Sequence, residues 1–85
     1  MLDTMSCLER FADSTRIHID LAVRVVNGSP ASVRVRNRFS NNLHEIVTCS
    51  PEGAFVTSWG YRLGTVEDID AAAARLAYLL AAMPA

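Results

Sequence analysis

The residues with the clearest chemical potential are arginines that alternate with apolar residues. Arg34, Arg36 and Arg38 recur at every second position, and Arg24 lies in the apolar run that precedes them. On a strand this alternation would place guanidinium groups about 7 Å apart on one face of a sheet. Guanidinium binds carboxylate or phosphate through two parallel hydrogen bonds. The sequence therefore predicts a site for an anion or an acidic protein surface at Arg24, Arg34, Arg36 and Arg38.

A solvated sheet face is the ordinary alternative for this arginine row. All eight basic residues of the chain are arginine, with no lysine, as a GC-rich coding sequence would produce. Nucleic acid is a third interpretation of the same row. The net charge of −1 disfavours it, because affinity for nucleic acid rests on a general attraction to phosphates. No recognition-helix pattern supports it either.

The two histidines lie in different parts of the strand region. One residue separates His18 from Asp20, so on a strand both side chains point the same way and could exchange protons. No nucleophile accompanies them at a fixed spacing, and a surface histidine beside an ion pair is the ordinary interpretation. His44 and Glu45 are adjacent and face opposite sides, so they make no metal site by themselves. The sequence predicts no catalytic residue, metal ligand or cofactor.

Aromatic residues alternate in the last apolar run. Phe55, Thr57, Trp59 and Tyr61 would share one face of a strand. Such a row is typical of a core under a covering helix, with the indole N–H and phenol O–H at its rim. A dimer interface or the wall of a ligand pocket is the alternative. The candidate residues for a pocket or interface are His18, Asp20, His44, Trp59 and Tyr61.

Cys7 and Cys49 have neither CxxC nor metal-ligand spacing. The N-terminal residues include acids and lack the apolar stretch of a secretory signal, so we expect a cytoplasmic protein with reduced thiols. Neither thiol has sequence neighbours that would lower its pKa, which favours two small apolar core groups over reactive thiols. One disulfide between them is the alternative. No apolar run approaches the ~20 residues of a membrane-spanning helix, so no membrane partner is expected.

Two helices are expected to flank the strand region. Residues 65–83 predict an amphipathic helix with Thr65 as N-cap and Asp68 as the capping-box acid. Its apolar stripe is wide enough to cover a sheet. Residues 2–13 predict a weaker helix that would fray or dock on a partner, because its apolar stripe is short.

Four strands are predicted between the helices, over residues 16–26, 33–38, 43–49 and 54–62, separated by turn signals. In the first strand Ile17, Ile19, Leu21, Val23 and Val25 would face the core. Gly60 would mark a bulge or a close backbone approach in the fourth strand.

The first hairpin has a constrained register. Its valines share one face only if the loop has an odd number of residues, and a three-residue loop sets Asp20 opposite Arg36 or Arg38. We therefore expect Asp20 to neutralise one arginine of the row.

The last third of the chain has a recognisable pattern. Residues 55–64 contain a Ser58-Trp59-Gly60 step and a Leu63-Gly64 turn, followed by an acidic, alanine-rich helix. This segment resembles short uncharacterised proteins of high-GC actinobacteria. The resemblance implies an α+β fold and a regulatory or interaction role, and it offers no catalytic residues to carry over.

The chain is long enough for one domain, residues 1–85, and its core is small. The predicted fold is α+β: a helix, four antiparallel strands, and a C-terminal helix packed on one sheet face. Small cores gain stability by self-association, so a homodimer is expected. The leading hypothesis is a non-catalytic binding or regulatory module that acts through protein–protein contact. The alternatives are a small cofactor-independent enzyme or ligand-binding dimeric barrel, and anion or nucleic-acid binding through the arginine row.

Overall fold

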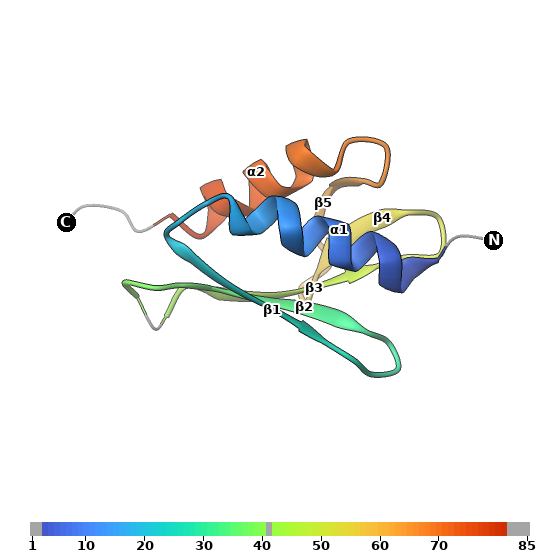
Figure 1. Cartoon of the computed structure of the whole chain (residues 1–85), viewed down its shortest axis with the longest axis horizontal. Coiled ribbons are helices and arrows are strands. Elements are labelled where there is room, and N and C mark those ends of the chain that lie inside the picture. The colour runs from blue at the N-terminus through green and yellow to red at the C-terminus, as the bar shows by residue number, and fades with distance from the viewer. Residues whose placement is uncertain (1–2, 41, 82–85) are drawn as a thin grey trace.

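The structure, a computed structural model, describes residues 3–40 and 42–81. It confirms an α+β fold with an N-terminal helix, an antiparallel sheet and a C-terminal helix. The sheet has five strands in the described residues, and each pairs with its neighbours in sequence. Both helices lie on the same side of the sheet (Figure 1). The elements are α1 (Thr4–Arg16), β1 (Leu21–Val26), β2 (Ser32–Asn37), β3 (His44–Cys49), β4 (Ala54–Thr57), β5 (Arg62–Thr65) and α2 (Ile69–Leu79).

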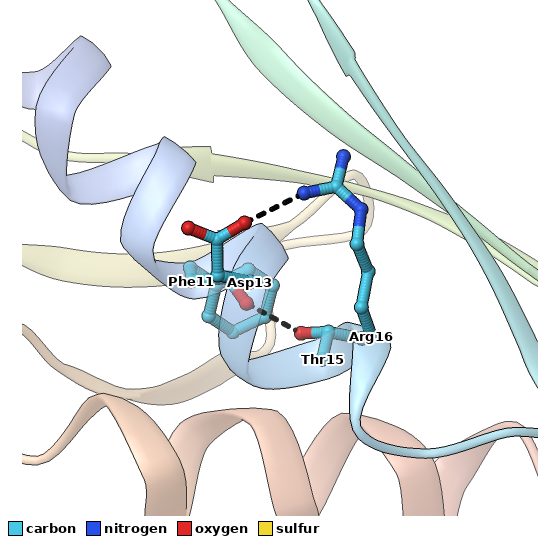
Figure 2. Close-up of polar contacts among 4 residues, drawn as sticks. All are labelled: Phe11, Asp13, Thr15 and Arg16. Atoms are coloured by element: carbon cyan, nitrogen blue, oxygen red, sulfur yellow. Dashed lines mark hydrogen bonds and ion pairs between the residues drawn. The ribbon is translucent and has the colours of Figure 1, made fainter.

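Helix α1 covers β1, β2 and β3 and also contacts α2. Its Asp3 N-cap accepts a hydrogen bond from the Ser6 N–H, and Phe11 stacks on Phe55 of the sheet with 4.7 Å between ring centroids. The predicted end at residue 13 is wrong. The helix continues to Arg16: in its last turn the buried Thr15 hydroxyl donates to the Phe11 carbonyl, and Arg16 forms an ion pair with Asp13 (Figure 2). Its predicted first residue, Leu2, lies outside the described residues.

Helix α2 begins later than predicted. Asp68, and not Thr65, is the N-cap, and its carboxylate accepts the Ala71 N–H. Thr65 instead ends β5 opposite Ala54. The Val66 N–H still donates to the Gly53 carbonyl, at 2.8 Å, so the chain stays attached to the sheet until residue 66. The described helix ends at Leu79, and the last predicted positions, 82 and 83, lie outside the described residues.

The two helices divide the covered face between them. Helix α2 packs on β5 and on α1, while α1 covers the other half of the sheet. A methyl group at Gly64 of β5 would lie 3.0 Å from the Cβ of Ala72 in α2, so glycine and alanine together allow this close approach. At the far end of α2, the buried Asn37 amide donates to the Leu80 carbonyl at 2.7 Å. These two contacts fix α2 at both ends.

The predicted fourth strand is two strands. The chain reverses between Thr57 and Tyr61, where the Thr57 N–H donates to the Tyr61 carbonyl and the Gly60 N–H to the Thr57 carbonyl. Gly60 has a φ of 89°, which glycine adopts without strain. It is therefore a turn residue, and the register irregularity lies at Phe55 and Val56 instead. Residues 54–62 resembled one strand because Trp59 and Tyr61, which lie in the turn or directly after it, continue the alternation that begins at Phe55.

The predicted first strand is too long. Residues 17–20 form turns, with the His18 N–H donating to the Thr15 carbonyl and the Leu21 N–H to the His18 carbonyl. Ile17 and Ile19 are 74% and 80% exposed and are not core residues. Because α1 extends to Arg16, the chain needs these residues to turn back along the sheet.

The first hairpin has its valines on one face, as predicted. Val23 pairs with Val35 and Val25 with Val33, all on the covered face. The loop spans residues 27–31, so it is odd but longer than three residues. The Arg38 N–H donates to the Asp20 carbonyl. Within the described residues their side chains form no ion pair, so the expected neutralisation is wrong.

Candidate functional site

The face of the sheet opposite the helices is open, since none of the described elements packs on it (Figure 1). Strand register places Arg24 opposite Arg34 and Arg36 opposite His44. Directly opposed residues of an antiparallel pair point to the same side. The alternation of burial along β2, with Val33 and Val35 buried and the arginines exposed, shows that this side is the open face. The open face is thus the arginine-bearing face.

A hollow of about 750 Å³ lies on the open face. It crosses β1, β2 and β3 and reaches the turn between β4 and β5. Ile46 pairs with Arg34 and adds an apolar surface beside the guanidinium groups. The residues that line it include Arg24, Arg34, Arg36, His44, Ile46 and Ser58.

The hollow has an excess of positive charge. Among the described residues, no carboxylate lies within ion-pair distance of Arg24, Arg34 or Arg36. Like charges directly opposite each other on a sheet are unfavourable, and Arg24 and Arg34 are such a pair. The arrangement therefore favours an anionic ligand, whose charge would offset this repulsion.

Glu45 is the acidic residue that lines the hollow, and other groups occupy its carboxylate. One oxygen, Oε1, accepts the backbone N–H and the hydroxyl of Ser58, and the other accepts the indole N–H of Trp59. Partial burial alone would raise the pKa of Glu45. Hydrogen bonds from Ser58, from the Ile46 N–H and from Trp59 outweigh burial and hold the pKa below its ordinary value. Glu45 thus holds the β4–β5 turn at the rim of the hollow as a carboxylate.

Trp59 and Tyr61 are solvent-facing, contrary to the predicted core row. Their rings stack with centroids 5.1 Å apart, and the side chains are 63% and 36% exposed. Phe55 and Thr57 of the same row are buried, as predicted. The row is interrupted because the chain reverses after Thr57, which carries the two later aromatic residues out of the core.

The structure brings together only part of the predicted site. Arg24, Arg34 and Arg36 share the hollow with His44, whereas Arg38 lies beyond the end of β2 and does not line it. His18 and Asp20 line a second hollow. Trp59 and Tyr61 are not among the lining residues of either hollow. Within one chain, the described residues therefore form no common pocket of the two histidines and the aromatic pair.

Sequence reasoning missed Glu45, Ser58, Ile46 and Arg62 as members of this surface. Arg62 of β5 pairs with Val56 of β4, and Val56 pairs with Thr48 of β3. This register places the exposed Arg62 on the open face as a further cation. Glu45 lies opposite the β4–β5 turn when the β3–β4 register is continued. Neither placement could be found before the turn at Ser58 was located. With that turn assigned, the register would have placed Arg62 on the open face. Glu45 pairs with Val35 of the covered side, so its place at the rim of the hollow follows only from its contacts with the turn.

The two cysteines lie near each other as free thiols. Cys7 of α1 is buried, and Cys49 at the end of β3 is half-buried. Burial, together with the charge and hydrogen bond of neighbouring Cys7, raises the pKa of Cys49 to about 11. A thiol with this pKa is protonated at neutral pH and is a poor nucleophile. Both cysteines therefore contribute to packing in this state.

In residues 3–40 and 42–81, no group of three or more His, Cys, Asp or Glu side chains is arranged to hold a metal ion. Over the same ranges, neither helix combines the length and the apolar character that crossing a membrane requires.

Comparison with known proteins found no match to this chain among protein-family models, curated proteins or solved structures.

Proposed function

We propose that this protein is a non-catalytic binding module whose open sheet face binds an acidic segment of a partner protein. The observation that carries the proposal is the cluster of Arg24, Arg34 and Arg36 around one hollow without a carboxylate partner in the described residues. A regulatory role in the cytoplasm belongs to the same proposal and is supported by the two free thiols.

The chemistry of the hollow favours carboxylates presented with an apolar residue. Each guanidinium can make a bidentate contact, and the opposed pair Arg24 and Arg34 could hold one carboxylate between them. Ile46 is 39% exposed, and the aliphatic stems of the arginines extend this apolar surface. The proposed ligand is therefore an extended acidic peptide segment with an aliphatic side chain directed at Ile46.

Nucleic acid would use the same arginines in a different way. Binding to a phosphate backbone requires many contacts and depends steeply on salt concentration. The chain has a net charge of −1, and its acidic residues would oppose a long polyanion. A short acidic peptide avoids this repulsion because it covers only the open face.

The test is a fluorescence anisotropy titration of the full chain with a labelled glutamate-rich peptide that contains one leucine. Substituting Arg24→Ala, Arg34→Ala and Arg36→Ala one at a time should weaken binding about tenfold each, since a hydrogen bond to a charged group contributes about 1.5–3 kcal/mol. Arg10→Ala is the matched control. It removes an exposed arginine from α1, on the opposite side of the sheet, and should leave the affinity unchanged.

Two further ligands make the test decisive. A peptide with glutamine in place of glutamate should not bind, because the arginines would lose their ionic partners. Equal binding of both peptides would contradict the proposal. So would tighter binding of a single-stranded oligonucleotide of the same length, with steep salt dependence, which would assign the open face to nucleic acid.

A further inference from the structure

A second surface lies at the end of the molecule where the α1–β1 turn meets the last turns of α2. Ile17, Ile19 and Tyr78 are 74%, 80% and 80% exposed there, and we call these three residues the apolar end. They border a hollow of about 530 Å³ whose lining includes the small residues Ala74 and Ala77 of α2. In Figure 1 this is the left-hand end, near the described end of the chain.

The apolar end has no role in the core. Ile17 and Ile19 lie in the turn before β1, and Tyr78 lies on the outer side of α2. A single exposed apolar side chain is ordinary, but several around one hollow mark a contact surface. Phe39, in the turn after β2, is also 76% exposed, and its N–H is held by Asn37, which lines the same hollow.

We infer that the apolar end binds a second copy of this chain across a two-fold axis. A two-fold interface places one patch against itself, so the patch must be self-complementary. Here large protruding side chains surround a hollow floored by alanines, and Tyr78 of each copy can enter the hollow of the other. The inference concerns a surface separate from the open face and goes beyond the proposed function.

Charge also favours a second copy at this end. Asp20 and Arg38 are joined by a backbone hydrogen bond, both are exposed, and their side chains form no ion pair in the described residues. When the patch meets its own copy across a two-fold axis, Asp20 of one copy can pair with Arg38 of the other, and Arg38 of the first with Asp20 of the second. The open face has arginines of one sign, and two copies would repel each other there. Self-association thus uses the apolar end and leaves the open face free.

The available area indicates a weak dimer. With aromatic side chains burying 150–250 Å² each, the exposed parts of Ile17, Ile19, Phe39 and Tyr78 supply roughly 500 Å² per copy. Stable interfaces bury about 800 Å² per partner. The apolar area is smaller than that of a stable interface, so we expect a weak dimer whose population depends on protein concentration, with the surrounding polar residues completing the interface.

Sedimentation equilibrium of the full chain, from micromolar to millimolar concentration, tests the inference. The native chain should change from monomer to dimer, and Tyr78→Glu or Ile19→Glu should weaken the dimer at least tenfold. Both sites are 80% exposed, so circular dichroism should show an intact fold. Trp59→Ala, which removes an exposed aromatic residue outside the apolar end, is the matched control and should dimerise like the native chain. A native chain that stays monomeric to millimolar concentration would overturn the inference.

A charge-swap mixture separates contacts between copies from contacts within one copy. Asp20→Arg and Arg38→Asp should each weaken homodimers, because like charges then meet across the axis. An equimolar mixture of the two variants should recover a heterodimer, in which each Arg meets an Asp of the other copy. If the mixture forms no heterodimer, or if only Arg34→Glu abolishes the dimer of the native chain, the interface lies elsewhere. Acidic-peptide binding by the monomeric Tyr78→Glu variant should be unchanged, so the two proposals fail independently.

Discussion

At the scale of single residues, Glu45 links the arginine hollow to the aromatic turn. Its carboxylate accepts hydrogen bonds from Ser58 and Trp59, and these bonds keep it ionised despite partial burial. This residue lines a basic hollow without neutralising the arginines, because its oxygens are directed at the turn. The sequence placed Glu45 beside His44 but could not show what its side chain contacts.

The lowered pKa of Glu45 predicts an acid-sensitive turn. Since the folded-state pKa lies below the unfolded-state value, the contribution of the carboxylate to stability is complete above the unfolded-state pKa. It is lost as the pH falls through the folded-state pKa. Carboxyl NMR titration should give a midpoint below the ordinary glutamate value, and exchange of the Trp59 indole N–H should accelerate below that midpoint.

Glu45→Gln should accelerate indole exchange at neutral pH and remove its acid dependence. Glu52→Gln, at an exposed glutamate in the turn before β4, is the control and should leave both observations unchanged. Acid-dependent exchange that persists in Glu45→Gln would contradict this role.

Asn37 is the buried polar residue that connects the sheet to α2. It is 2% exposed, its amide donates to the Leu80 carbonyl, and its Oδ1 accepts the Phe39 N–H. Asn37→Ala removes both bonds and leaves the Leu80 carbonyl without this donor. We expect the free energy of unfolding to fall by about 1–3 kcal/mol. Urea denaturation measures this loss, and the exposed Asn42→Ala should change stability far less.

At the scale of elements, α2 packs closely on β5 because small residues lie where the two backbones approach. Gly64 of β5 and Ala72 of α2 meet so closely that a methyl group on Gly64 would lie 3.0 Å from the alanine Cβ. The alanine-rich run predicted a slim helix face, and Ala72 confirms it. The close approach expected at Gly60 is found at Gly64 instead, since Gly60 serves the turn.

Gly64→Ala should lower the free energy of unfolding by about 1–3 kcal/mol, the usual cost of overpacking a core. Thermal or urea denaturation measures it. The double variant Gly64→Ala with Ala72→Gly should lose less stability than the sum of the single variants, because removing one methyl group makes room for the other. Strict additivity would show that the two positions do not contact each other. Ala71→Gly, at an exposed position of α2, is the control: it measures the loss in free energy of unfolding that comes only from replacing alanine by glycine in this helix.

At the scale of the whole molecule, the distinct surfaces are separated in space. The helices cover one face of the sheet, the arginines occupy the other, and the exposed isoleucines and Tyr78 gather at one end. A dimer formed at the apolar end would present two open faces to partner proteins. Linked sites of this kind bind a partner with two acidic segments more tightly than either site alone.

The sequence by itself determined the elements whose pattern is local. Alternation placed Val33 and Val35 inside and the β2 arginines outside. The requirement that the valines share one face correctly predicted a first-hairpin loop with an odd number of residues. Helical periodicity located most of the core stripe of both helices, although their ends differed and Leu79, predicted in the stripe, is 40% exposed. These features depend on neighbours a few residues apart, so periodicity is sufficient to predict them.

Only the tertiary structure decided the features that depend on contacts between distant segments. The turn at Ser58 is held by Glu45 of another strand. The last turn of α1 lies against α2, where the Ser14 hydroxyl donates to the Asp70 carboxylate and Thr15 is buried. Ile17 and Ile19 have the alternation of a strand, yet they lie in a turn because the helix before them ends late. The arginine row predicted a candidate binding site, but the open face, its hollow and its lack of a carboxylate partner among the described residues follow from where the helices pack. Packing is a property of the whole chain, and local residue order does not specify it.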